Sequence, residues 1–374
     1  MFGGLTLKNE EKAVFALRAL YQKYGYIPYK MSKFEEYDLY VRNKNFLVSD
    51  SIITFTDTNG KLMALKPDVT LSIVKNTKDA PGCVQKVYYD ENVYRISKNT
   101  HEFKEIMQTG LECIGDVGAY ETYEVVALAV QSLAAIGEKY VLDLSHIGFV
   151  SALLDNLDCG EKSRKDIVNA IGEKNQSELQ KICEENGFGL SDCEKLNVLV
   201  STYGTIESVL PKLEKICDTD ELKAVYDEFS ELCGLLHKNG LDENVRIDFS
   251  VANDMNYYSG IVFHGFIEGV PTGVLSGGRY DNLMKKMGRK SGAIGFAVYV
   301  DLLERLGMSD KHYDVDALLL YDGSSSAEEV SSAVRGLTEK VGSVTAQKSV
   351  PENLKFRELY KLDGKEVKLV ERDD

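Results

Sequence analysis

The chain of 374 residues is too long for one small domain, and it suffices for a large core with an appendage. Acidic residues outnumber basic ones, 59 to 44, and the net charge of −15 argues against nucleic acid as the main partner, since phosphate binding normally leaves a basic footprint. Seven scattered cysteines without a C-x-x-C pair, five isolated histidines and no long apolar stretch predict a cytoplasmic protein with no metal, no cofactor and no membrane partner.

The first third of the chain mixes helix and strand patterns. Apolar residues at helical spacing predict a helix over residues 10–24, and a strand follows at 26–29. Strands at 52–56 and 61–65 flank Asn59-Gly60, a dipeptide that favours a type I′ turn because both central residues need positive φ. We therefore expect an antiparallel hairpin here.

A short helix is expected to begin directly after this hairpin. Pro67 and Asp68 suit a helix start, because proline is tolerated there and an acidic residue favours the first turn. Further strands are predicted at 84–89, 92–96, 104–114 and 140–144, with a long helix at 120–136.

Strand patterns stop between residues about 147 and 240, where leucines and isoleucines lie among charged residues at helical spacing and predict an inserted helical subdomain. The sheet resumes at Val245, since Ile247, Phe249 and Val251 alternate with polar residues. Gly277-Gly278 near a strand end usually marks a place where something, often a ligand, approaches the backbone closely.

The end of the chain is predicted to form a small α/β appendage. It contains a buried-type strand at 317–321, a helix at 327–340, and short strands at 343–346 and 366–371. We therefore divide the chain into a core over residues 1–310, with the helical insertion at about 147–240, and a C-terminal domain over residues 311–374.

Two blocks in the second half of the core carry a family resemblance. Tyr257-Tyr258-Ser259-Gly260-Ile261-Val262-Phe263, followed by Gly277-Gly278-Arg279-Tyr280-Asp281, resembles the histidine-binding signature of histidyl-tRNA synthetases and of their non-catalytic relative, the regulatory subunit of ATP phosphoribosyltransferase. Tyr94-Arg95 with Gln108-Thr109-Gly110-Leu111-Glu112 resembles the second class II synthetase motif, and residues 292–303 resemble the third.

The resemblance is strong over residues about 10 to 306 and loose in the tail, where histidyl-tRNA synthetases carry a larger anticodon-binding domain. It implies an α+β fold, namely a class II aminoacyl-tRNA synthetase-like antiparallel sheet flanked by helices. The helical insertion and the small appendage are additions to this core.

The resemblance also implies a histidine site. Asp68 stands for the glutamate of the Pro-Glu-Gly-Thr segment that holds the α-ammonium, and we expect Asp68, Thr70 and Gln108 to bind this group, with Glu112 and Tyr258 on the imidazole. The expected histidine-binding set is Asp68, Thr70, Arg95, Gln108, Glu112, Tyr257 and Tyr258. Five of them have a structural alternative: helix capping for Asp68, a solvated strand position for Arg95 or Glu112, and sheet packing for the tyrosine pair.

Activation of histidine by ATP requires arginines, and at two of the family's arginine positions this chain has other residues. The Arg-Gly-Leu-Asp-Tyr-Tyr motif reads Asn253-Asp254-Met255-Asn256-Tyr257-Tyr258, so the catalytic arginine falls on Asn253. In the third motif the ATP-binding arginine falls on Leu302, although Arg305 copies it three residues later. Only Arg95 remains of three arginines, and we expect no catalytic residue.

We therefore expect a non-catalytic regulatory subunit of ATP phosphoribosyltransferase, needed for the first step of histidine biosynthesis and binding L-histidine for feedback regulation. Its expected partner is the short-form catalytic subunit, with a homodimer of this chain inside a hetero-oligomer. Two alternatives stay open: an active histidyl-tRNA synthetase or other histidine-activating enzyme, and a plain histidine-binding scaffold.

Overall fold

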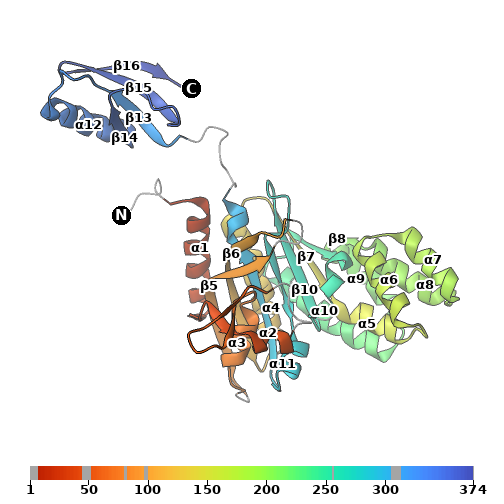
Figure 1. The fold of residues 1–374 in the computed structure, drawn as a ribbon. Helices are drawn as coiled ribbons and strands as arrows, with labels where there is room; N and C mark the ends of the chain where they lie inside the picture. Colours follow the sequence, from red (N-terminus) through yellow and green to blue (C-terminus); the bar gives the residue numbers. More distant parts are fainter. Residues whose placement is uncertain are drawn as a thin grey trace. The chain divides into compact units, whose positions relative to one another are not determined.

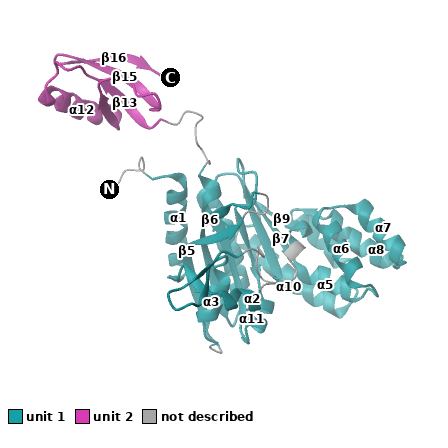
Figure 2. Ribbon diagram, viewed as in Figure 1, with its two compact units in different colours: residues 1–306 teal, residues 307–374 magenta. Residues whose placement is uncertain are grey.

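The computed structural model describes residues 7–43, 52–79, 82–96, 100–254, 257–304 and 313–373. It forms two compact units, residues 1–306 and residues 307–374 (Figures 1 and 2). Each unit buries its own set of apolar side chains, so each has a separate hydrophobic core.

The larger unit is built on a mainly antiparallel sheet. Across the sheet its strands are β1 (Ile27–Pro28), β5 (Val84–Ile96), β6 (Phe103–Gly115), β12 (Gly292–Tyr299), β11 (Leu275–Arg279), β10 (Ile261–Ile267), β7 (Tyr140–His146), β9 (Val245–Asp248) and β8 (Tyr203–Gly204). Only the β1–β5 and β7–β9 pairs are parallel. The sheet flanked by helices agrees with the expected α+β class.

Helices α1 (Asn9–Lys23) and α4 (Ala119–Ile136) pack on each other and against this sheet (Figure 1). Helix α1 buries Leu17 and Tyr21, which lie on one face because four residues make about one helical turn. Tyr21 also lies 3.2 Å from the Ser132 hydroxyl of α4 and packs edge-on against Phe296 of β12. These contacts hold α1 against α4 and against β12 of the sheet.

Smaller elements surround the sheet. A three-stranded sheet contains β2 (Phe34–Glu36), β4 (Leu62–Leu65) and β3 (Thr54–Thr56), and the short helices are α2 (Tyr37–Arg42), α3 (Thr70–Asn76), α11 (Asp281–Lys286) and the 3₁₀ helices η2 (Phe249–Asp254) and η3 (Val300–Leu303).

The segment after β7 is helical, with its apolar residues continuous with the main core. Its helices are α5 (Ile147–Asp155), α6 (Glu161–Gly172), α7 (Gln176–Asn186), α8 (Leu190–Ser201), α9 (Ile206–Glu214) and α10 (Asp220–Lys238). Figure 1 shows α6 to α9 gathered beyond the β8 edge of the sheet. The purely helical prediction was wrong at β8, a two-residue strand that extends the sheet by pairing with β9.

Three local predictions in this unit need correction. Residues 84–89 and 92–96 are one strand, β5, because the charged pair between them stays in register with β6. The hairpin of β3 and β4 is confirmed, but its turn is not type I′: only Gly60 has positive φ, and the Asp57 carboxylate accepts bonds from two backbone N–H groups of the loop. Phe249 and Val251 belong to η2 and not to a strand, which ends at Asp248.

The smaller unit has a four-stranded sheet and one helix. The order is β14 (Val344–Gln347), β13 (Val315–Leu320), β15 (Phe356–Asp363) and β16 (Glu366–Arg372), and α12 (Ala327–Val341) packs on β13 and β14. The sequence prediction missed β15, whose Arg357, Glu358 and Lys361 hide the strand pattern. Glu358 is nevertheless buried, because charged neighbours pair with it.

Two features are absent from the described residues. No helix there combines the length and apolar character needed to cross a membrane. In the same residues, no group of three or more His, Cys, Asp or Glu side chains is arranged to hold a metal ion.

Candidate functional site

The site centres on Glu112, a carboxylate in the middle of β6 that is only 2% exposed. One of its oxygens accepts a hydrogen bond from the Thr70 hydroxyl at 2.8 Å, and the other accepts a short bond from the Tyr280 hydroxyl. Thr70 is the first residue of α3 and Tyr280 directly follows β11, so three distant segments of sequence meet at this carboxylate. A solvated strand position, the structural alternative for Glu112, is wrong.

Glycines in the neighbouring strands make room for this group. Gly295 of β12 lies opposite Glu112 in register, and Gly278 of β11 lies opposite Gly295. A Cβ atom at Gly295 would collide with the Glu112 carboxylate, and one at Gly278 would lie 2.6 Å from the Tyr258 ring. The close approach expected at Gly278 is therefore made by Tyr258. Beside Glu112, the absence of a side chain at Gly295 leaves room for the carboxylate.

Asp68 is the second buried carboxylate and lies just before α3, at 8% exposure. It accepts a hydrogen bond from the Leu71 backbone N–H at 2.9 Å, which is the helix-start role that the sequence suggested. Burial raises its pKa, and the positive charges of Arg95 and Lys66 partly oppose this rise. Arg95 itself donates to the Pro67 carbonyl at 3.1 Å and so fixes the segment that carries Asp68.

Glu112 differs from Asp68 because the described residues supply it with no opposite charge. Burial raises the pKa of Glu112 to about 8; the bonds from Tyr280 and Thr70 oppose this rise, and the nearby Asp68 adds to it. Within the described part of the chain, Glu112 has hydroxyl partners and no lysine or arginine partner. Such an environment favours a cationic ligand, because a buried carboxylate is costly without an opposite charge.

The predicted tyrosines pack beside these carboxylates. The rings of Tyr257 and Tyr258 lie 4.7 Å apart at 75°, and Tyr257 lies 6.0 Å from the ring of Tyr280. Burial and the charge of Asp68 raise the pKa of the Tyr257 phenol. Tyr258, which was expected to bind the imidazole together with Glu112, lies over Gly278, and the Tyr280 hydroxyl donates to Glu112.

Gln108 and Glu112 project from the same face of β6, since alternate residues of a strand share a face. Gln108 is 4% exposed. Gly110 lies between them, where a side chain would strike the Tyr89 hydroxyl. The structure thus brings Asp68, Thr70, Glu112 and the tyrosines together, with Gln108 on the adjoining part of the strand.

Tyr280 was not among the predicted site residues. Its signal was present in the sequence, because it belongs to the Gly277-Gly278-Arg279-Tyr280-Asp281 block that carried the resemblance. Only the structure shows that this hydroxyl faces Glu112, at a sequence separation of 168 residues.

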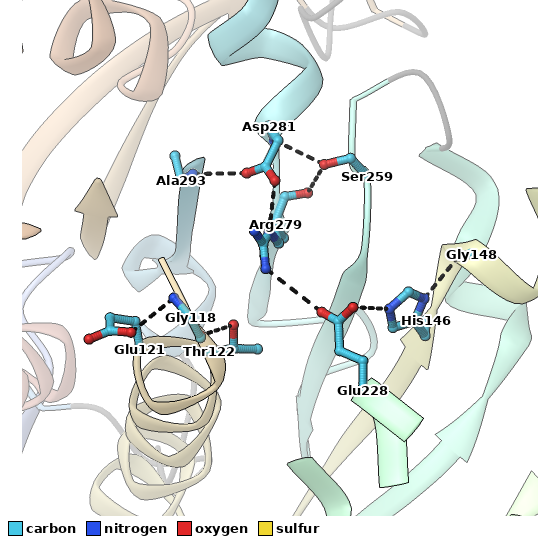
Figure 3. Close-up of polar contacts among 10 residues, drawn as sticks. All are labelled: Gly118, Glu121, Thr122, His146, Gly148, Glu228, Ser259, Arg279, Asp281 and Ala293. Carbon is cyan, nitrogen blue, oxygen red and sulfur yellow. Dashed lines mark hydrogen bonds and ion pairs between the residues drawn. The ribbon is translucent and has the colours of Figure 1, made fainter. Parts of the chain in front are cut away.

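A polar network holds the segment around Tyr280 in place, as Figure 3 shows. The Asp281 carboxylate accepts bonds from the Arg279 guanidinium at 2.8 Å and from the Ala293 backbone N–H at 3.0 Å. The Asp281 N–H donates to the Ser259 hydroxyl at 2.9 Å, and the Ser259 N–H donates to the Arg279 carbonyl at 2.8 Å. Residues on both sides of Tyr280 are therefore bonded to Ser259, which lies between Tyr258 and β10.

The positions expected for activation chemistry differ in character. Leu302 is partly buried and packs against the hydrophobic core. The side chain of Asn253 and all of Arg305 lie outside what the structure describes. Arg95 is the one of the three expected arginine positions that both carries an arginine and lies at the site.

Known proteins resemble the chain over most of its length. The histidyl-tRNA synthetase family model matches residues 6–303. The ATP phosphoribosyltransferase regulatory subunit of Clostridium novyi is 30% identical over 295 residues, which cover 76% of this chain and 69% of the relative.

Two solved structures share the fold. One is an ATP phosphoribosyltransferase regulatory subunit/histidyl-tRNA synthetase from Bacillus halodurans, with a TM-score of 0.73, 23% identity, and coverage of 94% of this chain and 93% of that one. The other is the ATP phosphoribosyl transferase (HisG:HisZ) complex from Thermotoga maritima, with a TM-score of 0.60, 21% identity, and coverage of 77% and 96%. The chain thus has the class II synthetase-like fold, and it belongs to the histidyl-tRNA synthetase-like family that includes the ATP phosphoribosyltransferase regulatory subunits.

Proposed function

We propose that this chain is a non-catalytic regulatory subunit of ATP phosphoribosyltransferase and that it binds L-histidine for feedback regulation. The names of its relatives support a regulatory subunit in histidine biosynthesis. The observation that supports this ligand is the pair of buried carboxylates, Glu112 and Asp68. Glu112 has hydroxyl partners and no lysine or arginine partner among the described residues, and burial keeps the pKa of Asp68 raised although Arg95 and Lys66 lie near it.

Histidine suits this pocket because it brings two groups that carboxylates can bind. Its α-ammonium would pair with Asp68, assisted by Thr70 and Gln108, and an imidazole N–H would donate to Glu112. The tyrosine rings would enclose the imidazole. A site with such buried polar groups rejects ligands that leave them unpaired, since each unpaired group costs about 1–3 kcal/mol.

The assembly partner that we propose is the short-form catalytic subunit of ATP phosphoribosyltransferase. Support comes from the T. maritima complex, because the chain that shares this fold is one of its two components. Co-expression of this chain with such a subunit, followed by transferase assays with and without histidine, tests the proposal. We expect activity that depends on this chain and falls when histidine is added; activity independent of this chain would contradict it.

A rival function is activation of histidine by an active synthetase. It conflicts with Asn253 and Leu302 at positions where the family pattern has arginine. ATP–pyrophosphate exchange that depends on histidine, well above background, would favour the rival. We expect none.

We also propose that the chain forms a homodimer within the hetero-oligomer, as class II relatives pair through their first motif. Exposed apolar side chains on and after α1 support this, namely Phe15, Tyr24 and Ile27. Sedimentation of the isolated chain at micromolar concentration should give a dimer, and a monomer would count against it.

A further inference from the structure

Glu228 of helix α10 makes a polar contact between the helical insertion and the segment that carries Tyr280. One carboxylate oxygen lies 3.7 Å from the Arg279 guanidinium, and the other lies 3.5 Å from Nε2 of His146 (Figure 3). Arg279 ends β11, and His146 ends β7; β10 separates these two strands in the sheet. The contact therefore joins one helix to two strand ends.

His146 adds the start of the insertion to this connection. Its Nδ1 accepts a hydrogen bond from the Gly148 backbone N–H at 3.0 Å, so the neutral ring carries its proton on Nε2, which faces Glu228. The same residue caps helix α5. Glu228 thus contacts both the beginning of the insertion, through His146, and the signature hairpin, through Arg279.

The path from Arg279 to the histidine pocket is short. Arg279 is directly followed by Tyr280, whose hydroxyl bonds the Glu112 carboxylate. The Arg279 guanidinium also holds Asp281 on the other side of Tyr280. A change in the position of Arg279 would therefore move the tyrosine that contacts Glu112.

The contact between Glu228 and Arg279 lies beside a small cavity. A cavity of about 150 Å³ is lined by Arg279, by Glu228 and Leu232 of α10, and by the first turn of α4. Within the described residues, the ion pair between Glu228 and Arg279 joins α10 to the hairpin beside this cavity. The position of Glu228 also suits its charge, since the N-terminus of α4 lines the same cavity.

We propose that Glu228 is a positioning residue for the histidine pocket: through Arg279 it sets the place of Tyr280, and it makes the helical insertion respond to histidine. The proposal rests on histidine binding as proposed above. Ordering of Tyr280 by the ligand would be passed to α10 and, through His146, to α5. A partner that contacts the insertion could then respond to histidine in the pocket.

The test compares Glu228→Gln with Glu231→Gln in the full chain. Gln has nearly the shape of Glu and removes the charge that faces Arg279; Glu231 lies on the same helix and is exposed. Calorimetry should show histidine bound about two- to five-fold more weakly by Glu228→Gln, the range for a partly exposed ion pair, and unchanged by Glu231→Gln. Thermal unfolding should give similar midpoints for both variants.

Hydrogen exchange supplies a readout that a merely structural role would not move. In the wild type and in Glu231→Gln, histidine should slow amide exchange in α5 and α10; in Glu228→Gln this protection should be lost even at saturating histidine. Protection that persists in Glu228→Gln, with unchanged affinity, would overturn this proposal while histidine binding stands. A wild-type chain that binds no histidine would overturn both.

A second variant guards against a general effect of removing charge. Arg279→Gln removes the opposite charge, namely the cation that faces Glu228, together with the guanidinium nitrogen that donates to Asp281. Combined with Glu228→Gln, it should weaken binding by less than the product of the two single effects, because both changes act on one contact. Independent effects of the two changes would contradict the coupling.

Discussion

Two carboxylates, one in each unit, expose little surface and have pKa values shifted in opposite directions. Glu358 of the small unit is 3% exposed; it accepts a bond from Tyr360 at 2.5 Å and lies 2.7 Å from the Arg372 guanidinium. The Tyr360 bond and the Arg372 charge hold its pKa below the ordinary value. Glu112 also has a tyrosine partner, yet its pKa rises to about 8.

Two differences separate them: burial dominates the pKa of Glu112, and Glu358 has a cation beside it. Glu358 is paired with the positive charge of Arg372 within the fold, so it needs no ligand to balance its own charge. Glu112 has hydroxyl donors on both oxygens and no described lysine or arginine partner, so its charged form is complete only when a cation or a strong N–H donor arrives from outside. Burial alone does not mark a binding residue; burial without an internal opposite charge does.

The strongest way to break this comparison is to neutralise each carboxylate in turn. Glu112→Gln keeps the shape but turns an N–H₂ group toward one hydroxyl, so histidine affinity should fall about 10- to 150-fold, equivalent to ~1.5–3 kcal/mol. Glu358→Gln should leave histidine affinity unchanged. Calorimetry on both variants checks this. Equal histidine affinities for the two variants would mean that Glu112 has only a structural role.

Asp68→Asn sharpens the comparison by separating the two ends of the ligand. Its carboxylate is expected to hold the α-ammonium, so histidine should bind about ten-fold more weakly, while imidazole, which lacks that group, should bind as before. Glu112→Gln should weaken both ligands. Should Asp68→Asn weaken imidazole equally, the residue supports the pocket through its bond to the Leu71 N–H instead.

The opposite pKa shifts predict opposite effects of pH on stability. Glu112 holds its proton in the folded state up to about pH 8 and releases it near 4.5 when unfolded, so its contribution to stability is present at low pH and declines as pH rises through this interval. The slope is at most about 1.4 kcal/mol per pH unit. Urea unfolding from pH 5 to 8 should show a flatter profile in Glu112→Gln; an identical slope would mean that Glu112 is ionised in the fold.

The reverse holds for Glu358. Its lowered pKa makes its contribution present above the unfolded pKa and lost as pH falls through the folded value. Glu358→Gln should therefore change the profile only in the acidic range and leave the slope above pH 5 as in the wild type. A change above pH 5 would count against the assignment.

Much of this site could be predicted from the sequence, because its residues stand in short motifs. Asp68 and Thr70 follow a recognisable helix start, and Glu112 keeps register with Gln108 on one strand. What the sequence could not supply was the pairing between segments. That Thr70 and Tyr280 both donate to Glu112 depends on strand order and on the glycines beside it.

The errors in the fold prediction have a similar cause. Strand β15 was missed because alternation of apolar and charged residues looks solvated when the partners of Glu358 are unknown. Strand β8 was missed because a two-residue strand is defined by its neighbour β9 and not by its own residues. In both cases tertiary contacts outweigh local propensity.

The smallest expected effect concerns the tyrosine hydroxyl that donates to each carboxylate. Tyr280→Phe removes the hydroxyl that donates to Glu112 and should weaken histidine about five-fold, equivalent to ~1 kcal/mol. Because that bond lowers the pKa of Glu112, its loss should also extend the decline of stability to higher pH. Tyr360→Phe removes the corresponding hydroxyl from Glu358 and is the matched control, with histidine affinity expected to be unchanged. If Tyr280→Phe binds histidine as well as the control does, the hydroxyl serves only the empty pocket, and the ligand itself must take over its place on Glu112.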